Sequence, residues 1–411
     1  MRRIPVALGL IATTLLLLPE PSPAAEVTSR GQALRRHAAA QSAVVRPAHK
    51  VGLGKTLSTK DGGQIFGFDI DQNGDDGVLA SAQTETSGGA ALVSVETFDQ
   101  DTGKITKSFD KYDGLRRQYA VDAIFAGDIA LVTHYIQEKD SIYYRRVFDL
   151  MNPVTAQKFT GLWVSPIKDM LLWGAAENQT TPTAVLFAYA APKHGGSLER
   201  PNLVVTNFST NTSTVFPLDI NLFGVADGPQ VGQYSAANEA VFALTPDGGR
   251  VGGEAPVNVL VNLTTGAQKQ FNGLNEGPYG SGDVNGLAVD PNTGMAATTT
   301  ELNAQVEFYD LKKQAGIAVQ LPCTGSASEY SSGSGIANDP INHLFLVTEY
   351  YYCDASQGSA ILVYDEHAKL IETITGFAFG IGEPAPAINP SKRMGWALGG
   401  DGFTQLRQFF Y

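Results

Sequence analysis

The chain of 411 residues is poor in cysteine and histidine, with two and six of them. No two histidines have the His-x-x-x-His spacing of a common zinc site. A complete Gly-x-Ser-x-Gly pattern is also missing, which removes the signature of an α/β-hydrolase nucleophile. Basic residues are fewer than acidic ones, 29 against 41. This balance argues against a nucleic-acid partner, whose binding surface is normally basic.

Long hydrophobic runs are also scarce, and the clearest is Val6–Leu18 near the N-terminus. It is too short to span a bilayer as a stable helix. Arg2 and Arg3 precede it and small residues follow it at Ser22–Ala25, which is the layout of a secretory signal peptide. We therefore expect a secreted or periplasmic protein whose mature chain has no membrane span. The expected parts are a signal peptide at 1–24, a flexible leader at 25–49 and one folded domain at 50–411.

The sequence from about residue 50 onward has the pattern of strands and turns. Short runs of Val, Ile, Leu, Phe and Tyr alternate with polar residues and are cut by Gly, Pro, Asn and Asp. Two landmarks recur about every 50 residues, which is the size of a propeller blade. One is a pair of apolar strands joined by a tight turn, clearest around Asp290–Gly294. The other is an apolar strand ending at a polar residue, found at Asp99, Asp149, Asn207, Asn262, Asp310 and Asp365.

This repeat predicts an all-β fold, a seven-bladed β-propeller. A six-bladed ring is the alternative if the weak unit at 163–218 is an insertion. The last unit, at 383–411, has room for only three strands. We expect Val51–Thr59 to become the outer strand of the last blade and to close the ring, since closure removes free sheet edges.

The best-formed repeats, Asn285–Gly294 and Ser334–Pro340, resemble blades of the NHL/YVTN/SMP-30 group of β-propellers. The resemblance covers residues 283–376 and implies the propeller fold. SMP-30-like lactonases hold a divalent ion at the channel mouth with a Glu and several Asn or Asp residues. Asn285 matches such a position, but Ser334 stands where Asp is usual. The channel-mouth candidates are Asp283, Asn285, Ser334, Glu383 and Tyr350, the last from a tyrosine cluster.

An Asp-rich stretch, Asp69–Gly77, has the ligand spacing of a calcium loop. It is similar to the loops of integrin-type propellers and EF-hands, but Gly77 and Ala80 stand where their closing ligands would be. The alternative is a plain hairpin turn, which Asp and Asn also favour. Calcium is the only cofactor that the sequence suggests. Its candidate ligands are Asp69, Asp71, Asn73 and Asp75.

Both cysteines, Cys323 and Cys353, belong to the part expected to be exported. In a propeller, the connections between blades and the middle loop of each blade share one face, here called the loop face. The two cysteines should meet on it and form a disulfide in an oxidising compartment, with two free thiols as the alternative. The long loops gather there too, and such loops commonly carry binding residues.

We therefore expect an exported, monomeric propeller that binds a small molecule or a protein through its loop face. The first alternative is a metal-dependent, lactonase-like hydrolase at the central channel. The second is a structural envelope protein that calcium only stabilises. The sequence leaves open whether the protein is an enzyme.

Overall fold

The structure is a computed structural model, and the elements that it describes are strands and turns between residues 51 and 411. No helix that could cross a membrane occurs among the residues it describes. The described residues are 51–60, 62–72, 74–83, 92–109, 120–126, 129–137, 144–152, 157–158, 163–164, 170–178, 183–190, 201–208, 210–218, 230–231, 239–244, 257–272, 284–300, 305–322, 332–350, 359–378, 385–399 and 403–411.

Five sheets are regular meanders of four consecutive antiparallel strands. The first sheet has β2 (Gln64–Ile70), β3 (Asp76–Gln83), β4 (Leu92–Asp99) and β5 (Lys104–Phe109). The third has β11 (Met170–Asn178), β12 (Thr183–Ala190), β13 (Pro201–Asn207) and β14 (Thr212–Pro217). The fourth has β15 (Gln230–Val231), β16 (Glu239–Leu244), β17 (Val257–Asn262) and β18 (Gln268–Asn272). The fifth has β19 (Val284–Val289), β20 (Met295–Thr300), β21 (Gln305–Asp310) and β22 (Ala315–Gln320), and the sixth has β23 (Ser332–Asp339), β24 (Leu344–Tyr350), β25 (Ser359–Asp365) and β26 (Leu370–Phe377).

Two further sheets depart from this regular order. The second sheet has β6 (Ala120–Ala126), β7 (Ile129–Gln137) and β8 (Tyr144–Asn152), and its outer strand is split into β9 (Gln157–Lys158) and β10 (Trp163–Val164). Both short strands pair with β8. The last sheet joins β27 (Ala387–Asn389), β28 (Met394–Gly399) and β29 (Gln405–Phe410) to β1 (Gly52–Ser58) from the start of the folded unit.

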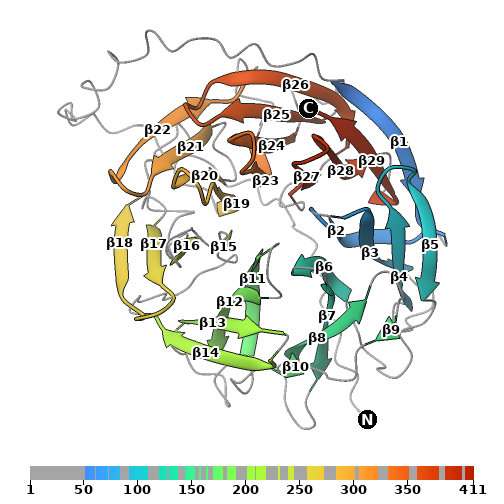
Figure 1. Ribbon diagram of the computed structural model, residues 1–411, viewed down its shortest axis with the longest axis horizontal. Coiled ribbons are helices and arrows are strands. Elements are labelled where there is room, and N and C mark those ends of the chain that lie inside the picture. The colour runs from blue at the N-terminus through green and yellow to red at the C-terminus, as the bar shows by residue number, and fades with distance from the viewer. Residues whose placement is uncertain are drawn as a thin grey trace, which may run out of the picture. The chain divides into compact units, whose positions relative to one another are not determined.

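The sheets follow one another around a common centre (Figure 1). Each innermost strand contacts the next, in the order β2, β6, β11, β15, β19, β23 and β27, and β27 contacts β2 again. The predicted all-β propeller is therefore confirmed. The predicted seven blades are not confirmed, because only five of the sheets in the described part of the chain have the regular order of four consecutive strands. The weak unit is no insertion, since β11–β14 form a sheet of their own.

The predicted closing strand is present. β1 pairs antiparallel with β29, with Leu57 opposite Leu406. The side chains of both residues are buried, because this outer strand also packs against β26 of the sixth sheet. The backbone amide of Thr59 extends the pairing by donating to the carbonyl of Thr404 at 3.2 Å.

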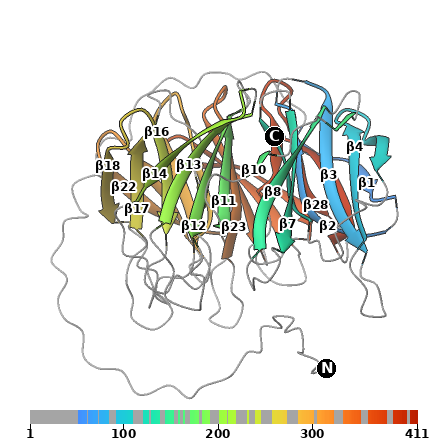
Figure 2. The same cartoon turned by 90° about the horizontal axis from the view of Figure 1, so that it is seen from below.

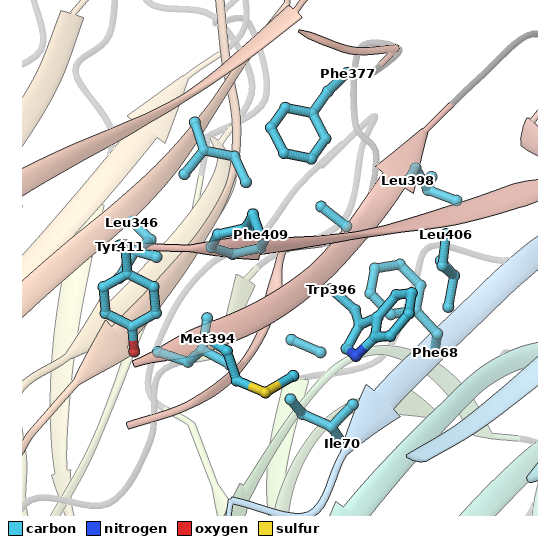
Figure 3. Close-up of a cluster of buried hydrophobic side chains, with 14 of the residues drawn as sticks. Phe68, Ile70, Leu346, Phe377, Met394, Trp396, Leu398, Leu406, Phe409 and Tyr411 are labelled. Atoms are coloured by element: carbon cyan, nitrogen blue, oxygen red, sulfur yellow. The ribbon is translucent and has the colours of Figure 1, made fainter. Parts of the chain in front are cut away.

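A large apolar cluster lies where the sixth, last and first sheets meet (Figure 3). Trp396 of β28 is fully buried and meets Phe98 of β4 edge to face, with ring centroids 5.4 Å apart. Gly103, at φ 64°, leaves room for the indole of Trp396, because a Cβ atom at position 103 would lie 2.7 Å from Cη2 of that ring. Burial of each such side chain stabilises the fold by about 1.5–3 kcal/mol. The contact between the first and last sheets is therefore well packed.

The strands run between two faces that differ in their connections (Figure 2). Tight turns join the first strand to the second, and the third to the fourth, on what we call the turn face. The bounds of β27 and β28, for example, leave only Pro390–Arg393 between them. Most of the other connections reach the loop face and are longer, as between β12 and β13 or β14 and β15, although β20 and β21 are joined by a short one. The antiparallel order thus puts the long connections on one face, as the sequence predicts.

Candidate functional site

Three of the five channel-mouth candidates fall on two neighbouring sheets. Asn285 is on β19 and Ser334 is on β23, and these innermost strands contact each other. Tyr350 ends β24 and pairs with Ser332 of β23. All three positions are near the strand ends that lead to the loop face. Asp283 and Glu383 lie outside the described residues.

Buried carboxylates below the loop face are a feature that the sequence reasoning missed. Glu96, Glu307 and Glu349 are each at most 1% exposed. Glu96 accepts hydrogen bonds from the backbone amide of Lys60, in the connection that enters the first sheet, at 3.1 and 3.4 Å. Glu307 accepts one from the Thr298 hydroxyl at 3.4 Å. An acidic residue inside an apolar strand was the available signal, since an ionised group is costly to bury without partners.

The phenol of Tyr364, in the sixth sheet, has a raised pKa. Burial, and secondarily the negative charge of Glu349, raises the pKa of Tyr364 far above its ordinary value. The ring of Tyr364 packs against Phe308 of the fifth sheet. This phenol therefore remains protonated at any physiological pH and acts as part of the packing between the two sheets.

The Asp-rich stretch forms the turn of the first hairpin. Asp69 lies in β2, where Oδ1 accepts from the amide of Ile70 at 2.8 Å. The Asp71 amide closes the turn by donating to the carbonyl of Asp76 at 2.9 Å. Asn73 lies outside the described residues. Within the described ranges, no group of three His, Cys, Asp or Glu side chains is placed to hold a metal ion.

Gln100, the residue after β4, is the centre of the contacts around this turn. Its side-chain amide donates to the carbonyls of Asp71 and Asp76, each at 2.7 Å. The backbone carbonyl of Gln100 accepts from Trp396 Nε1 at 3.2 Å and from Gln408 Nε2 at 2.8 Å. Gln100 is fully buried and therefore joins the first hairpin to β28 and β29 of the last sheet.

Lys392 brings a positive charge to the same turn from the last sheet. Its Nζ donates to Oδ1 of Asp75 at 2.5 Å and to Oδ1 of Asp101 at 2.9 Å. Burial lowers the pKa of Lys392, but the hydrogen bonds that its ammonium donates to these carboxylates outweigh burial and raise the pKa. Burial first, and then the charges of Asp71, Asp75 and Asp99, raise the pKa of Asp76. The turn is thus a concentration of negative charge that the lysine partly neutralises.

Similar contacts between neighbouring sheets recur along the turn face. In the fifth, sixth and last sheets, the residue that begins the inner turn holds its own turn with one oxygen and reaches the next sheet with its second polar atom. Asp339 bonds the amides of its turn through Oδ1, while its Oδ2 accepts from Tyr411 Oη at 3.1 Å. Asn389 follows the same rule, with Nδ2 donating to the carbonyl of Gly74 at 3.2 Å. The inner turns of these three sheets are therefore each linked to a neighbouring sheet through a side chain.

Cys323 and Cys353 both lie outside the described residues. Their disulfide remains a prediction from the sequence.

The comparisons with known proteins agree with the architecture. No family model matches the chain, and a search of curated proteins gives no significant match. Solved structures do superimpose. The "Crystal structure of RRP9 WD40 repeats" has a TM-score of 0.61 at 11% identity, over 88% of this chain and 99% of that one.

Two other solved structures give the same picture. The "Structure of U3-55K" has a TM-score of 0.58 at 12% identity, over 88% of this chain and 98% of that one. A chain of the "Crystal Structure of Mitotic Checkpoint Complex" has a TM-score of 0.53 at 13% identity, over 94% and 99%. The chain has a WD40-like propeller fold. At such low identity these neighbours show the fold alone, and the NHL/YVTN/SMP-30 resemblance rests on residues 283–376 of the sequence.

Proposed function

We propose that this chain is an exported, seven-bladed β-propeller that binds a protein or a small molecule with its loop face. The observation that carries the proposal is the difference between the two faces. The turn face uses its polar groups on neighbouring turns, as Asp339 and Asn389 do. The long connections lie on the opposite face, and long loops on a rigid scaffold are typical binding elements.

The ring of sheets supports binding because it fixes the positions at which these connections begin and end. Buried side chains such as Trp396 and Phe345 hold neighbouring sheets together, and contacts between inner strands continue around the channel. A rigid scaffold lowers the entropy lost when loops bind a partner. One of the superimposable chains was solved within a protein complex, which is consistent with a protein as the ligand.

Export follows from the sequence around Val6–Leu18 and can be tested separately. Expression of the full chain with and without residues 1–24, followed by N-terminal sequencing of the protein outside the cytoplasm, is the direct test. We expect a mature N-terminus near Ala25 and no export of the shortened chain. Retention of the full chain in the cytoplasm would contradict export without bearing on the loop face.

The binding face is tested with any ligand that raises the thermal midpoint of the purified mature chain in a screen of defined proteins and metabolites. Tyr350→Ala and replacement of residues 351–358 by a Gly-Ser linker change the loop face. Lys313→Ala changes the turn face and serves as the control. We expect the loop-face variants to lose the thermal shift and the control to keep it. The opposite pattern would overturn the assignment of the binding face.

A metal-dependent hydrolase is the second candidate, favoured by the placement of Asn285 and Ser334 on contacting inner strands. Metal analysis of the purified chain, with Asn285→Ala as the variant, separates it from a binding protein. Stoichiometric divalent ion lost in this variant, together with lactone hydrolysis, would support the enzyme. Neither property is expected of a binding scaffold.

A further inference from the structure

The Asp-rich turn has the spacing of a calcium loop, in which the residue at position 7 would bind the ion through its backbone carbonyl. That residue is Asp75, whose carbonyl already accepts from the backbone amide of Gln100 at 2.8 Å. Other carbonyls of the turn are also hydrogen-bonded to groups of the protein. The amide of Gln100 donates to the carbonyls of Asp71 and Asp76. Asn389 donates from the last sheet to the carbonyl of Gly74. Calcium requires six to eight oxygens around one ion. These amide donors therefore compete directly with a metal for the carbonyl ligands.

Part of the negative charge of the turn is also balanced from within the chain. Lys392 reaches both Asp75 and Asp101, and its own side chain is only 27% exposed. Lys55 of β1 adds a second contact, with Nζ donating to the carbonyl of Asp101 at 3.0 Å. Both lysines belong to the last sheet, whereas the acids and the carbonyl belong to turns of the first. The ammonium of Lys392 therefore supplies positive charge beside Asp75, one of the four candidate calcium ligands.

We propose that the Asp-rich turn binds Lys392 in place of a metal ion and thereby holds the first sheet to the last. We call the contact region between these two sheets the seam, and this set of side chains the seam clasp. The seam clasp consists of Gln100, Asn389 and Lys392 together with Asp75 and Asp101. It closes the ring through side chains, in addition to the backbone pairing of β1 with β29. This inference is independent of what the loop face binds.

Calcium titration of the mature full chain gives the first test. With the carbonyls and carboxylates engaged, we expect calorimetry with CaCl2 to show no binding that depends on the turn. Wild type and Asp75→Asn should then give the same titration. Stoichiometric calcium binding that Asp75→Asn abolishes would overturn the proposal.

Hydrogen exchange gives the second test, because it reports the opening of individual strands. Lys392→Met should speed exchange in β1, β2 and β27, by up to about five-fold, since half-exposed ion pairs are individually weak. Lys392→Arg should restore protection. Lys313→Met is the matched control, because Lys313 pairs with Asp310 of its own sheet at 2.7 Å and should leave these strands unchanged.

Salt provides a test that needs no substitution, should Lys392→Met fail to fold. About 0.5 M NaCl screens exposed charges and should speed exchange in the same strands of wild type. If neither salt nor the variant changes exchange at the seam, or if both raise it equally in all sheets, the proposal is wrong.

Discussion

The imidazole Nδ1 of His343 lies 2.7 Å from Oδ2 of Asp290, which connects the sixth sheet to the fifth. The carboxylate of Asp290 is fully buried, and its Oδ1 accepts from the amides of Asn292 and Thr293 at 2.8 and 3.2 Å. One side chain therefore shapes a turn and holds the adjacent sheet.

Replacing Asp290 with alanine should lower the free energy of unfolding by about 2–4 kcal/mol, because two amides and an imidazole lose a buried acceptor. Urea denaturation followed by far-UV circular dichroism measures the change. Asp365→Ala is the control, since the carboxylate of Asp365 accepts from the backbone amides of His367 and Lys369 in its own exposed turn. It should cost about 1 kcal/mol. Equal losses in the two variants would show that the contact with His343 contributes nothing.

Trp396→Ala should be among the most destabilising single substitutions at the seam, with a loss of about 3–5 kcal/mol. It removes a fully buried ring and the hydrogen bond to the carbonyl of Gln100. Ile371→Ala is a matched apolar control at a position 40% exposed, and should change stability by less than about 0.5 kcal/mol. A small loss for Trp396→Ala in the same urea series would contradict the packing described for the first and last sheets.

Leu57→Ala tests the closing strand. Leu57 is 2% exposed and lies opposite Leu406, so we expect a loss of about 2–5 kcal/mol. Val51, at 45% exposed, precedes the strand, and Val51→Ala should have almost no effect. Deleting residues 51–59 leaves β29 without its neighbour and should prevent cooperative unfolding. A truncated chain with wild-type stability would contradict ring closure by β1.

Asp99 should contribute to the loss of folding stability at acidic pH. The hydrogen bond from the Thr102 hydroxyl is the main cause that lowers the pKa of this carboxyl below its ordinary 3.8. Ionised Asp99 therefore stabilises the folded chain above that pH, and the contribution is lost as the pH falls through the folded-state pKa. In thermal unfolding, the gap between wild type and Asp99→Asn should be widest above about pH 5 and narrow below about pH 4. A gap that grows in acid would reverse the sign of this linkage.

The proposed export into an oxidising compartment predicts a disulfide between Cys323 and Cys353. Mass spectrometry of peptides from unreduced protein should identify the linked pair, and Cys353→Ser should lower stability by roughly 3 kcal/mol through the entropy of the released loop. Cys323→Ser should have the same effect, and the double variant should lose no more than either single one. Two thiols that react freely in the native protein would contradict the disulfide.

Much of the fold is local enough to be predicted from sequence. Polar turns between apolar strands, as at Asp290–Gly294, specify a hairpin because the residues that shape it are neighbours in the chain. The closing strand is predictable from counting, since the last unit lacks one strand. The split outer strand of the second sheet is not, because β9 and β10 have two residues each and carry no periodic pattern.

The contacts at the seam are beyond such reasoning. Gln100 follows Asp99 in what reads as an exposed polar turn, yet it is fully buried. Its partners Asn389 and Trp396 come almost 300 positions later, at separations of 289 and 296 residues. Lys392 is similarly remote in sequence from the Asp-rich turn, so the pattern that resembles a calcium loop could not predict their contact. Only the arrangement of the sheets brings these groups together.

Because β1 pairs with β29, the first strand that the structure describes cannot complete its pairing until the last described strand has been synthesised. A polypeptide that crosses a membrane with its amino end leading would carry an incomplete last sheet until its tail emerged. The last sheet is therefore completed only after β29 has been synthesised, and a chain released before that point would leave β1 without its pairing strand.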